Sequence, residues 1–207
     1  MARTPGSAAD ETRQRILDVA LALFVERGYA GTSVRDIAER LQMTKGSLYY
    51  HFSAKEDVLH ALLTPVLDAL DRFVARARAA GAMSPDLMAV LVDLLDEQGP
   101  LLRSLFNDPS VRREVMTRHR LPERLTALQQ VLGGGDDPAA VLRGRCALGV
   151  IHAGALAPSD PTTKAEPGRA GRTQPRLTDE EKAFVTRAAL AVLAAEPPGP
   201  AAGRRRR

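Results

Sequence analysis

The 207-residue chain has no tryptophan, one cysteine, and aromatic side chains at only 4% of its positions. The single cysteine, Cys146, cannot form an intramolecular disulfide, and a metal site built from several cysteines is excluded. Scarce cysteine fits a reducing compartment, so we expect a cytoplasmic protein. Enzyme motifs are missing as well: a glycine-rich phosphate loop, a nucleophile elbow, HExxH, and Cys/His metal spacing. We therefore predict no enzymatic activity, no cofactor and no metal.

The sequence also has no long apolar run and no large excess of either sign of charge. The longest stretch without Asp, Glu, Lys or Arg is residues 146–159, 14 residues, whereas a membrane-spanning helix needs about 20. Residues 1–7 lack the apolar core of a signal peptide, and we expect no membrane association. The net charge of +4 equals the contribution of the four arginines at 204–207, so the remaining chain is neutral. Composition alone thus gives no indication of nucleic-acid binding.

Apolar residues recur at helical spacing along most of the chain, and period-two runs of Val, Ile and Thr are absent. The chain is therefore predicted to be all-α, with about nine helices. A Ser53–Glu56 capping box is expected to open a long helix that Pro65 kinks, and Thr178–Glu181 is expected to open the last helix. The other expected helices cover residues 10–27, 34–41, 44–52, 87–97, 109–118, 122–132 and 138–156.

The second and third helices carry the most information. They are short, about three residues join them, and the small residue Ala38 lies where they would cross. Such a pair forms a helix-turn-helix, whose second helix enters the major groove of DNA. On pattern alone, an ordinary helical hairpin explains the segment equally well.

The residue identities favour the DNA-binding interpretation. Gly28-Tyr29, Thr32–Leu41 (TSVRDIAERL), Thr44–Phe52 (TKGSLYYHF) and Lys55-Glu56 closely resemble the N-terminal domain of the TetR family of bacterial transcriptional regulators. The similarity covers residues 10–60 without gaps. Gln42 departs from the pattern because the family usually has Gly in this turn, and a positive φ there would cost glutamine about 1 kcal/mol.

The resemblance implies a domain order and a function. It implies an N-terminal three-helix helix-turn-helix domain, followed by a helical dimerisation and ligand-sensing domain. The protein would be a sequence-specific DNA-binding transcriptional regulator, an effector-released homodimeric repressor acting on an inverted-repeat operator. The alternative is a helical ligand-binding or interaction protein without sequence-specific DNA binding. The expected regions are a flexible arm (1–9), the DNA-binding domain (10–60), the helical body (61–196, with a flexible loop at 157–176) and a disordered basic tail (197–207).

Residues of the helix-turn-helix region are predicted to contact DNA. Hydroxyl and imidazole groups can donate hydrogen bonds to phosphate oxygens, and Lys45 can reach the edge of a guanine. Gly46 allows the backbone to approach the groove closely. Lys55 adds a positive charge beside a helix N-terminus, close to the DNA backbone. The ten predicted contacts are Ser33, Arg35, Thr44, Lys45, Gly46, Ser47, Tyr49, Tyr50, His51 and Lys55.

Alternatives exist for some of these residues. Arg35 has another possible partner in Glu39, one helical turn further on. Tyr49 shares a face with Leu48 and Phe52, so it is the tyrosine expected to be part-buried. Residues 1–60 hold eight basic and eight acidic side chains, so DNA binding must depend on where charges are placed.

The helical body is expected to hold a mainly apolar effector and the dimer contacts. Core packing is the alternative for each apolar residue, and a buried histidine is the expectation for His152. The predicted ligand residues are Leu67, Leu70, Leu91, Leu94, Leu102, Arg103, Phe106, Asn107, Met116, His119, Leu128, Cys146 and His152. Predicted dimer residues, for which packing within one chain is the alternative, are Gly149, Ala153, Gly154, Phe184, Val185, Ala188 and Val192.

Overall fold

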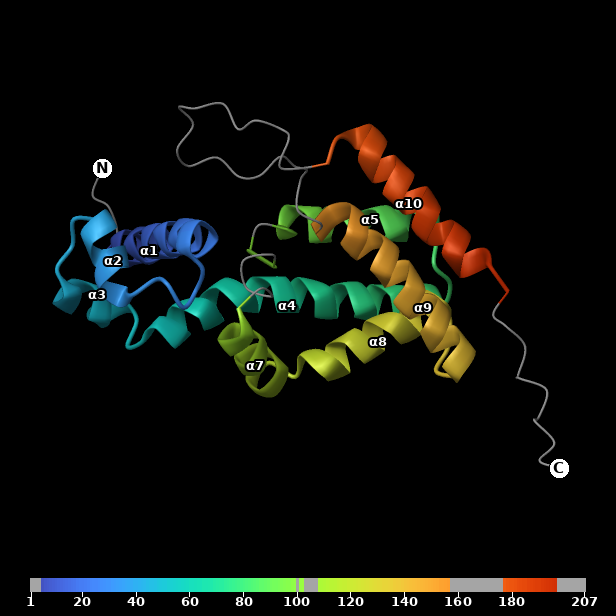
Figure 1. Ribbon diagram of the computed structural model, residues 1–207, viewed down its shortest axis with the longest axis horizontal. Coiled ribbons are helices and arrows are strands. Elements are labelled where there is room, and N and C mark those ends of the chain that lie inside the picture. The colour runs from blue at the N-terminus through green and yellow to red at the C-terminus, as the bar shows by residue number, and fades with distance from the viewer. Residues whose placement is uncertain (1–4, 100, 103–107, 157–176, 197–207) are drawn as a thin grey trace. The chain divides into compact units, whose positions relative to one another are not determined.

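A computed structural model describes residues 5–99, 101–102, 108–156 and 177–196, and these are almost entirely helical (Figure 1). No strand occurs in these ranges, which confirms the prediction of an all-α chain with about nine helices. The elements in order are α1 (Pro5–Arg27), α2 (Val34–Arg40), α3 (Lys45–His51), α4 (Lys55–Ala80), α5 (Pro85–Glu97), α7 (Pro109–Arg118), α8 (Leu121–Gly133), α9 (Pro138–Ile151), the π-helical η1 (His152–Leu156) and α10 (Asp179–Ala194).

The helices divide between two compact units. The first contains α1, α2, α3, the beginning of α4, and α7. Apolar side chains from α1, α2, α3 and α4 form its core, which includes Ile16, Leu23, Phe24, Ile37, Leu48, Val58 and Leu59. The second contains the rest of α4 with α5, α8, α9, η1 and α10, around Phe73, Met88, Leu91, Leu128, Ala147, Ile151 and Val185.

Local capping sequences set most helix starts. Ser33 caps α2 and its side chain accepts from the Asp36 N–H, while Ser84 with Pro85 opens α5. Asp137 accepts from two backbone N–H groups at the start of α9. The predicted Thr178–Glu181 capping box is present at the start of α10.

Two predicted boundaries are wrong. The helix α1 begins at Pro5, so residues 5–9 are not a flexible arm; proline is favoured in the first helical turn, and Ala8 and Ala9 are strong helix formers. The Ser53–Glu56 capping box does not form. The Asp57 carboxylate instead accepts from the Ala54 N–H at 3.1 Å, and Glu56 accepts from the Tyr29 hydroxyl. The predicted loop 157–176 and tail 197–207 lie outside the described residues.

The α9 and η1 helices form one long apolar segment, Pro138–Leu156. It is 19 residues long and contains an 18-residue window with a mean hydropathy of 1.2, so by length and composition alone it could cross a membrane. Core helices of globular proteins pass the same test. In the second unit this segment contacts α8, α5 and α10, and Ala140, Gly144, Ala147 and Ile151 are buried along it.

Candidate nucleic-acid interface

The α2 and α3 helices are joined by a tight turn held by backbone hydrogen bonds. The N–H groups of Gln42 and Met43 donate to the carbonyl oxygens of Glu39 and Ala38, at 3.0 and 2.9 Å. Gln42 has φ +57°, the left-handed conformation that costs a residue with a Cβ atom. Ala38 is 2% exposed, consistent with a small residue at the crossing point. The two helices therefore form a helix-turn-helix.

The α3 helix is anchored on one face and open on the other. Thr44 caps its start by accepting from the Ser47 N–H at 3.1 Å, and Leu48 is fully buried. Tyr49 is 49% exposed and Tyr50 is 85% exposed. Tyr49 is therefore the less exposed of the two tyrosines, as expected, although half of its surface is open to solvent. Lys45, Gly46 and Ser47 are also exposed. A rigid helix thus presents cationic and hydroxyl groups outward.

Gly46 has no packing role within the chain. A Cβ atom added there would meet only the Thr44 hydroxyl, at 3.9 Å. Gly46 has no positive φ either. The absence of a side chain at this exposed position therefore leaves room for something outside the chain.

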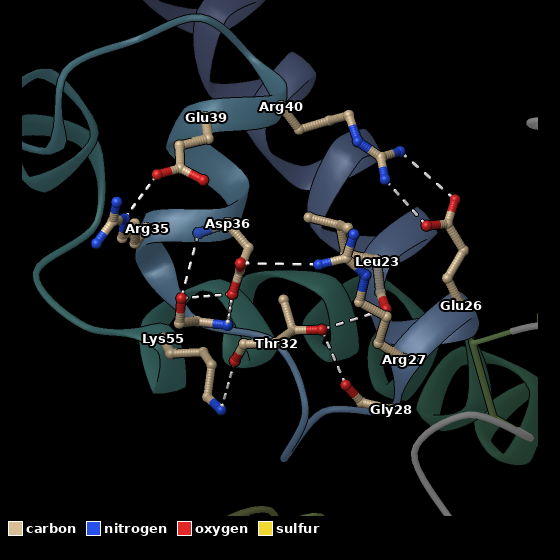
Figure 2. A network of polar contacts seen from close by, with 11 residues as sticks. Leu23, Glu26, Arg27, Gly28, Thr32, Arg35, Asp36, Glu39, Arg40 and Lys55 are labelled. Atoms are coloured by element: carbon tan, nitrogen blue, oxygen red, sulfur yellow. Dashed lines mark hydrogen bonds and ion pairs between the residues drawn. The ribbon is translucent and has the colours of Figure 1, made fainter.

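Polar contacts cap the start of α2 and join its end to α1 (Figure 2). Asp36 accepts from the backbone N–H and the hydroxyl of Ser33, and these hydrogen bonds lower the pKa of the Asp36 carboxyl. Arg40 forms an ion pair with Glu26 of α1 at 3.0 Å. Arg35 pairs with Glu39 at 2.6 Å, which confirms the alternative partner expected for it. The α2 helix is thus capped at its start and paired with α1 at its end, while Arg35 lies at the surface.

Lys55 connects the start of α4 to the turn between α1 and α2. Its ammonium donates to the carbonyl oxygens of Tyr29 and Thr32, at 2.8 and 2.9 Å, and lies 4.0 Å from the centroid of the Tyr29 ring. Thr32 is 2% exposed and its hydroxyl donates to the Leu23 and Gly28 carbonyls (Figure 2). Burial, together with the nearby Glu56 carboxylate, raises the pKa of the Tyr29 phenol. The predicted contact between Lys55 and DNA stays a prediction; in the free chain Lys55 binds internal carbonyls.

An open hollow of about 670 Å³ gathers half of the predicted DNA contacts. It is lined by the turn between α1 and α2, the start of α2, the exposed face of α3 and the start of α4. The predicted contacts on its wall are Ser33, Arg35, Lys45, Tyr49 and Lys55.

Two further predicted contacts lie at the end of α3. The Tyr50 ring lies edge-on to the His51 ring, with 5.3 Å between the ring centroids. Tyr29 and Thr32 belong to the segments that resemble the TetR family but are not among the predicted site residues; their backbone carbonyl oxygens accept from Lys55.

The predicted ligand residues are divided between the two compact units. Leu67, Leu102, Met116 and His119 lie in the first unit, and the other described members lie in the second. Leu70, Leu91 and Leu128 are buried in the core of the second unit. The expectation of a buried His152 is wrong, because it is exposed at the start of η1; Cys146, on α9, is exposed as well. Arg103, Phe106 and Asn107 lie outside the described residues.

The predicted dimer residues divide between two faces of α9, η1 and α10. A Cβ atom on Gly154 would lie 2.5 Å from a Val185 methyl, so these two residues pack within the chain. Gly149 and Ala153 are exposed, and Phe184 is 65% exposed. Ala188 and Val192 are half-buried. The exposed members remain available to a second subunit.

Comparisons with known proteins agree with this geometry. A family model described as "Bacterial regulatory proteins, tetR family" matches residues 16–62. The HTH-type transcriptional regulator SrpR of Pseudomonas putida is 44% identical over 63 residues, 30% of each chain. The HTH-type transcriptional repressor KstR2 of Rhodococcus jostii is 38% identical over 94 residues, 43% of this chain and 46% of that protein. The matches therefore span less than half the length of these curated relatives.

Similarity to solved structures extends over nearly the whole chain. AmtR of Mycobacterium smegmatis has a TM-score of 0.62 and 26% identity, covering 96% of this chain and 92% of that chain. A transcriptional regulator from Aquifex aeolicus VF5 has a TM-score of 0.60 and 20% identity, covering 88% and 98%. The second comparison shows a shared fold.

Proposed function

Since this chain belongs to the TetR family of bacterial transcriptional regulators, we propose that it is a sequence-specific DNA-binding regulator of transcription. The observation that carries the proposal is the exposed face of α3, with Lys45, Gly46, Ser47, Tyr49 and Tyr50, held on a capped helix whose other face is buried. A helix-turn-helix places such a face in the major groove. Lys45 would reach a base edge, while hydroxyl groups around it would hold phosphates.

The hollow between α2, α3 and α4 suits the adjacent phosphate backbone. Its wall combines the guanidinium of Arg35 with the ammonium groups of Lys45 and Lys55. Phosphate contacts fix the position of a protein along DNA without reading sequence. The 60 N-terminal residues carry eight positive and eight negative side chains, so the attraction is local, and we expect weak non-specific binding.

We further propose that the regulator is a homodimer and an effector-released repressor. One helix-turn-helix reads a half-site, and a two-fold pair reads an inverted repeat. The exposed residues Gly149, Ala153 and Phe184 support a partner contact through α9, η1 and α10. Several similar proteins are described as repressors. A small, mainly apolar effector in the helical body would shift the population toward a dimer that no longer matches its operator.

This function involves no catalysis, and we place the protein in the cytoplasm, where its DNA is. Similar proteins are transcriptional regulators rather than enzymes.

Selection from a random pool of duplex DNA at physiological salt tests the function. We expect enrichment of an inverted repeat whose half-sites lie about one helical turn apart. The variant Lys45→Ala is expected to lose the enriched sequence, whereas Arg112→Ala, which removes an exposed cation on α7, is expected to keep it. Failure of folded, dimeric protein to enrich any sequence would overturn the proposal and favour an interaction protein.

A further inference from the structure

An arginine of α1 lies against the end of α3. The guanidinium carbon of Arg13 is 4.6 Å from the centroid of the Phe52 ring, which is within the range of a cation–π contact. Phe52 ends α3, where its N–H donates to the Leu48 carbonyl, and it is 3% exposed. Arg13 itself is exposed to solvent. A buried ring thus holds a solvent-facing cation beside the last turn of α3.

Most other cations of this domain already have partners within the chain. Between residues 5 and 60, those with a partner are Arg27, Arg35 and Arg40, each in an ion pair, and Lys55, which binds two backbone carbonyls. The cations of this range for which the described residues provide no ion pair are Arg13, Arg15 and Lys45. Lys45 begins α3, and Arg13 lies at its other end. The two ends of α3 therefore each have a positive charge that no carboxylate neutralises.

The contact with Phe52 leaves the hydrogen-bonding capacity of Arg13 unused. A guanidinium has five N–H donors, and a phenyl ring offers them no oxygen or nitrogen acceptor. Arginine can bind a phosphate through two parallel N–H···O bonds, and such charge-assisted bonds are stronger than neutral ones. Because the ring already restricts the side chain, less conformational entropy is lost when an anion binds. Arg13 is therefore prepared for a phosphate oxygen.

The position of Arg13 also suits the dimensions of DNA. The α3 helix has seven residues, so it is about 10 Å long. The major groove is about 12 Å wide, and side chains at either end of a helix in this groove can approach the phosphate backbone. The hollow between α2, α3 and α4 already offers Arg35, Lys45 and Lys55 to phosphates. Arg13 does not line this hollow, so it provides a positive charge at a separate point.

We propose that Arg13 binds a DNA phosphate, and that Phe52 holds it in position to do so. The inference rests on the proposed DNA-binding function and adds a residue to that interface. A phosphate contact carries no sequence information, so Arg13 contributes affinity and fixes the end of α3 along the backbone. The alternative is that Arg13 only stabilises the packing of Phe52 and the C-terminus of α3, where a cation is favourable.

Fluorescence anisotropy with the full-length chain over a salt series distinguishes these two roles. The probes are the labelled duplex enriched in the selection from the random pool, and a scrambled duplex of the same length. The variant Arg13→Gln removes the charge but keeps an aliphatic stem over the ring. We expect it to bind the enriched duplex about tenfold more weakly and to reduce the salt slope by about one. The ratio of its affinities for the two duplexes should stay that of the wild type.

Two further variants serve as controls. Arg15→Gln makes the same charge change two residues away on α1, at an exposed side chain, and should bind DNA like the wild type. Arg13→Lys keeps the charge but not the planar pair of N–H donors. It should keep the salt slope and bind with an affinity between those of the wild type and Arg13→Gln. Urea denaturation of each variant measures its stability.

Three outcomes would overturn the proposal. They are an affinity and slope in Arg13→Gln equal to those of the wild type, an equal loss in Arg15→Gln, or a loss of affinity with an unchanged slope and a lower unfolding midpoint. The last would assign Arg13 to packing alone. All three leave the DNA-binding function standing, whereas absence of DNA binding by the folded wild type overturns that function and this inference with it.

Discussion

The ammonium group of Lys55 lies 4.0 Å from the centroid of the Tyr29 ring and donates a 2.8 Å hydrogen bond to the carbonyl oxygen of the same residue. A second hydrogen bond joins it to the Thr32 carbonyl. The start of α4 is thereby fixed to the turn that precedes α2. The placement of the two DNA-facing helices depends on this side chain as well as on the buried core.

Substituting Lys55→Met should therefore destabilise the DNA-binding domain. Two charge-assisted hydrogen bonds are lost, and we expect a decrease of about 2 kcal/mol in the free energy of unfolding. Urea denaturation of the full chain, followed by circular dichroism, measures the change. The control Lys45→Met removes an exposed cation, so it should leave stability nearly unchanged while weakening DNA binding. Equal stability of Lys55→Met and wild type would show that these hydrogen bonds do not hold the domain.

The turn between α2 and α3 gives a second prediction. Gln42 has φ +57°, and Gly adopts this conformation without the steric cost of a Cβ atom. Because Gly also gains entropy in the unfolded chain, the net gain from Gln42→Gly is expected to be about 0.5 kcal/mol. The variant Gln42→Ala removes the same polar group but keeps Cβ, so it should give no gain. Matched urea curves of the three proteins decide whether the backbone is strained here.

Local sequence was sufficient to predict much of this domain. Ser33 and Thr44 cap their helices in the structure, and a hydroxyl residue directly before a helical pattern is the local signal for that role. The small residue at position 38 and the residue identities of α3 indicated the helix-turn-helix. The opening of α4 was less predictable, because Glu56 has a better partner in the Tyr29 hydroxyl, 27 residues earlier.

Contacts between distant segments left no comparable signal. The hydrogen bond from Ala30 to Asp108 joins residues 78 positions apart, and the pairing of His60 with His119 spans 59. In the helical body, small residues indicate that another helix can pack closely, but they do not show whether that helix belongs to the same chain or to a second subunit. Gly154 packs on Val185 of its own chain, whereas Gly149 has no neighbour within 4 Å of its Cβ position. The two glycines are indistinguishable in sequence.

The ion pair between Arg35 and Glu39 predicts a gain in DNA affinity when it is broken. Both side chains are exposed, so the pair contributes little to stability. The variant Glu39→Gln frees the Arg35 guanidinium for a phosphate and removes a negative charge near the DNA. We expect affinity to rise several-fold at low salt, with a steeper salt dependence. Fluorescence anisotropy across a salt series measures both, and Glu97→Gln, on α5, is the control. Unchanged affinity and slope in Glu39→Gln would place Arg35 outside the interface.

Acid should destabilise the protein partly through the cap of α9. The Ala140 N–H, and then the Ala139 N–H, donate to the Asp137 carboxylate, and these hydrogen bonds lower its pKa. A lowered pKa in the folded state means that the charge stabilises the fold above about pH 4 and ceases to do so as pH falls through the folded pKa. Wild type should exceed Asp137→Asn in unfolding free energy at pH 7, with the difference vanishing near pH 2. The neutral amide still caps the helix, so the comparison isolates the charge.

Denaturation of both proteins from pH 7 to pH 2 provides the measurement. The neighbouring variant Asp136→Asn is the control, because Asp136 does not accept the N–H groups that begin α9. A wild-type advantage that is constant across this range would show that the carboxylate charge is not responsible.

The outer face of α9 and α10 supplies the last prediction. Phe184 is 65% exposed although it is large and apolar, and such side chains in groups mark interaction sites. If this face joins two subunits, Phe184→Glu should raise the dimer dissociation constant by roughly thirtyfold. Val90→Glu places the same charge on another exposed apolar site, on α5, and should not affect dimerisation.

A second variant tests the same face without adding charge. Gly149→Met places a long side chain where nothing lies within 4 Å, so it should not disturb the packing of its own chain, and helix propensity improves. In a dimer that brings α9 close to a partner helix, this side chain keeps the helices apart, and dissociation should increase. Sedimentation equilibrium over a concentration series measures each constant. If the dimer is as stable in both variants as in the wild type, the subunits contact each other through another face. That other face would then set the distance between the two recognition helices.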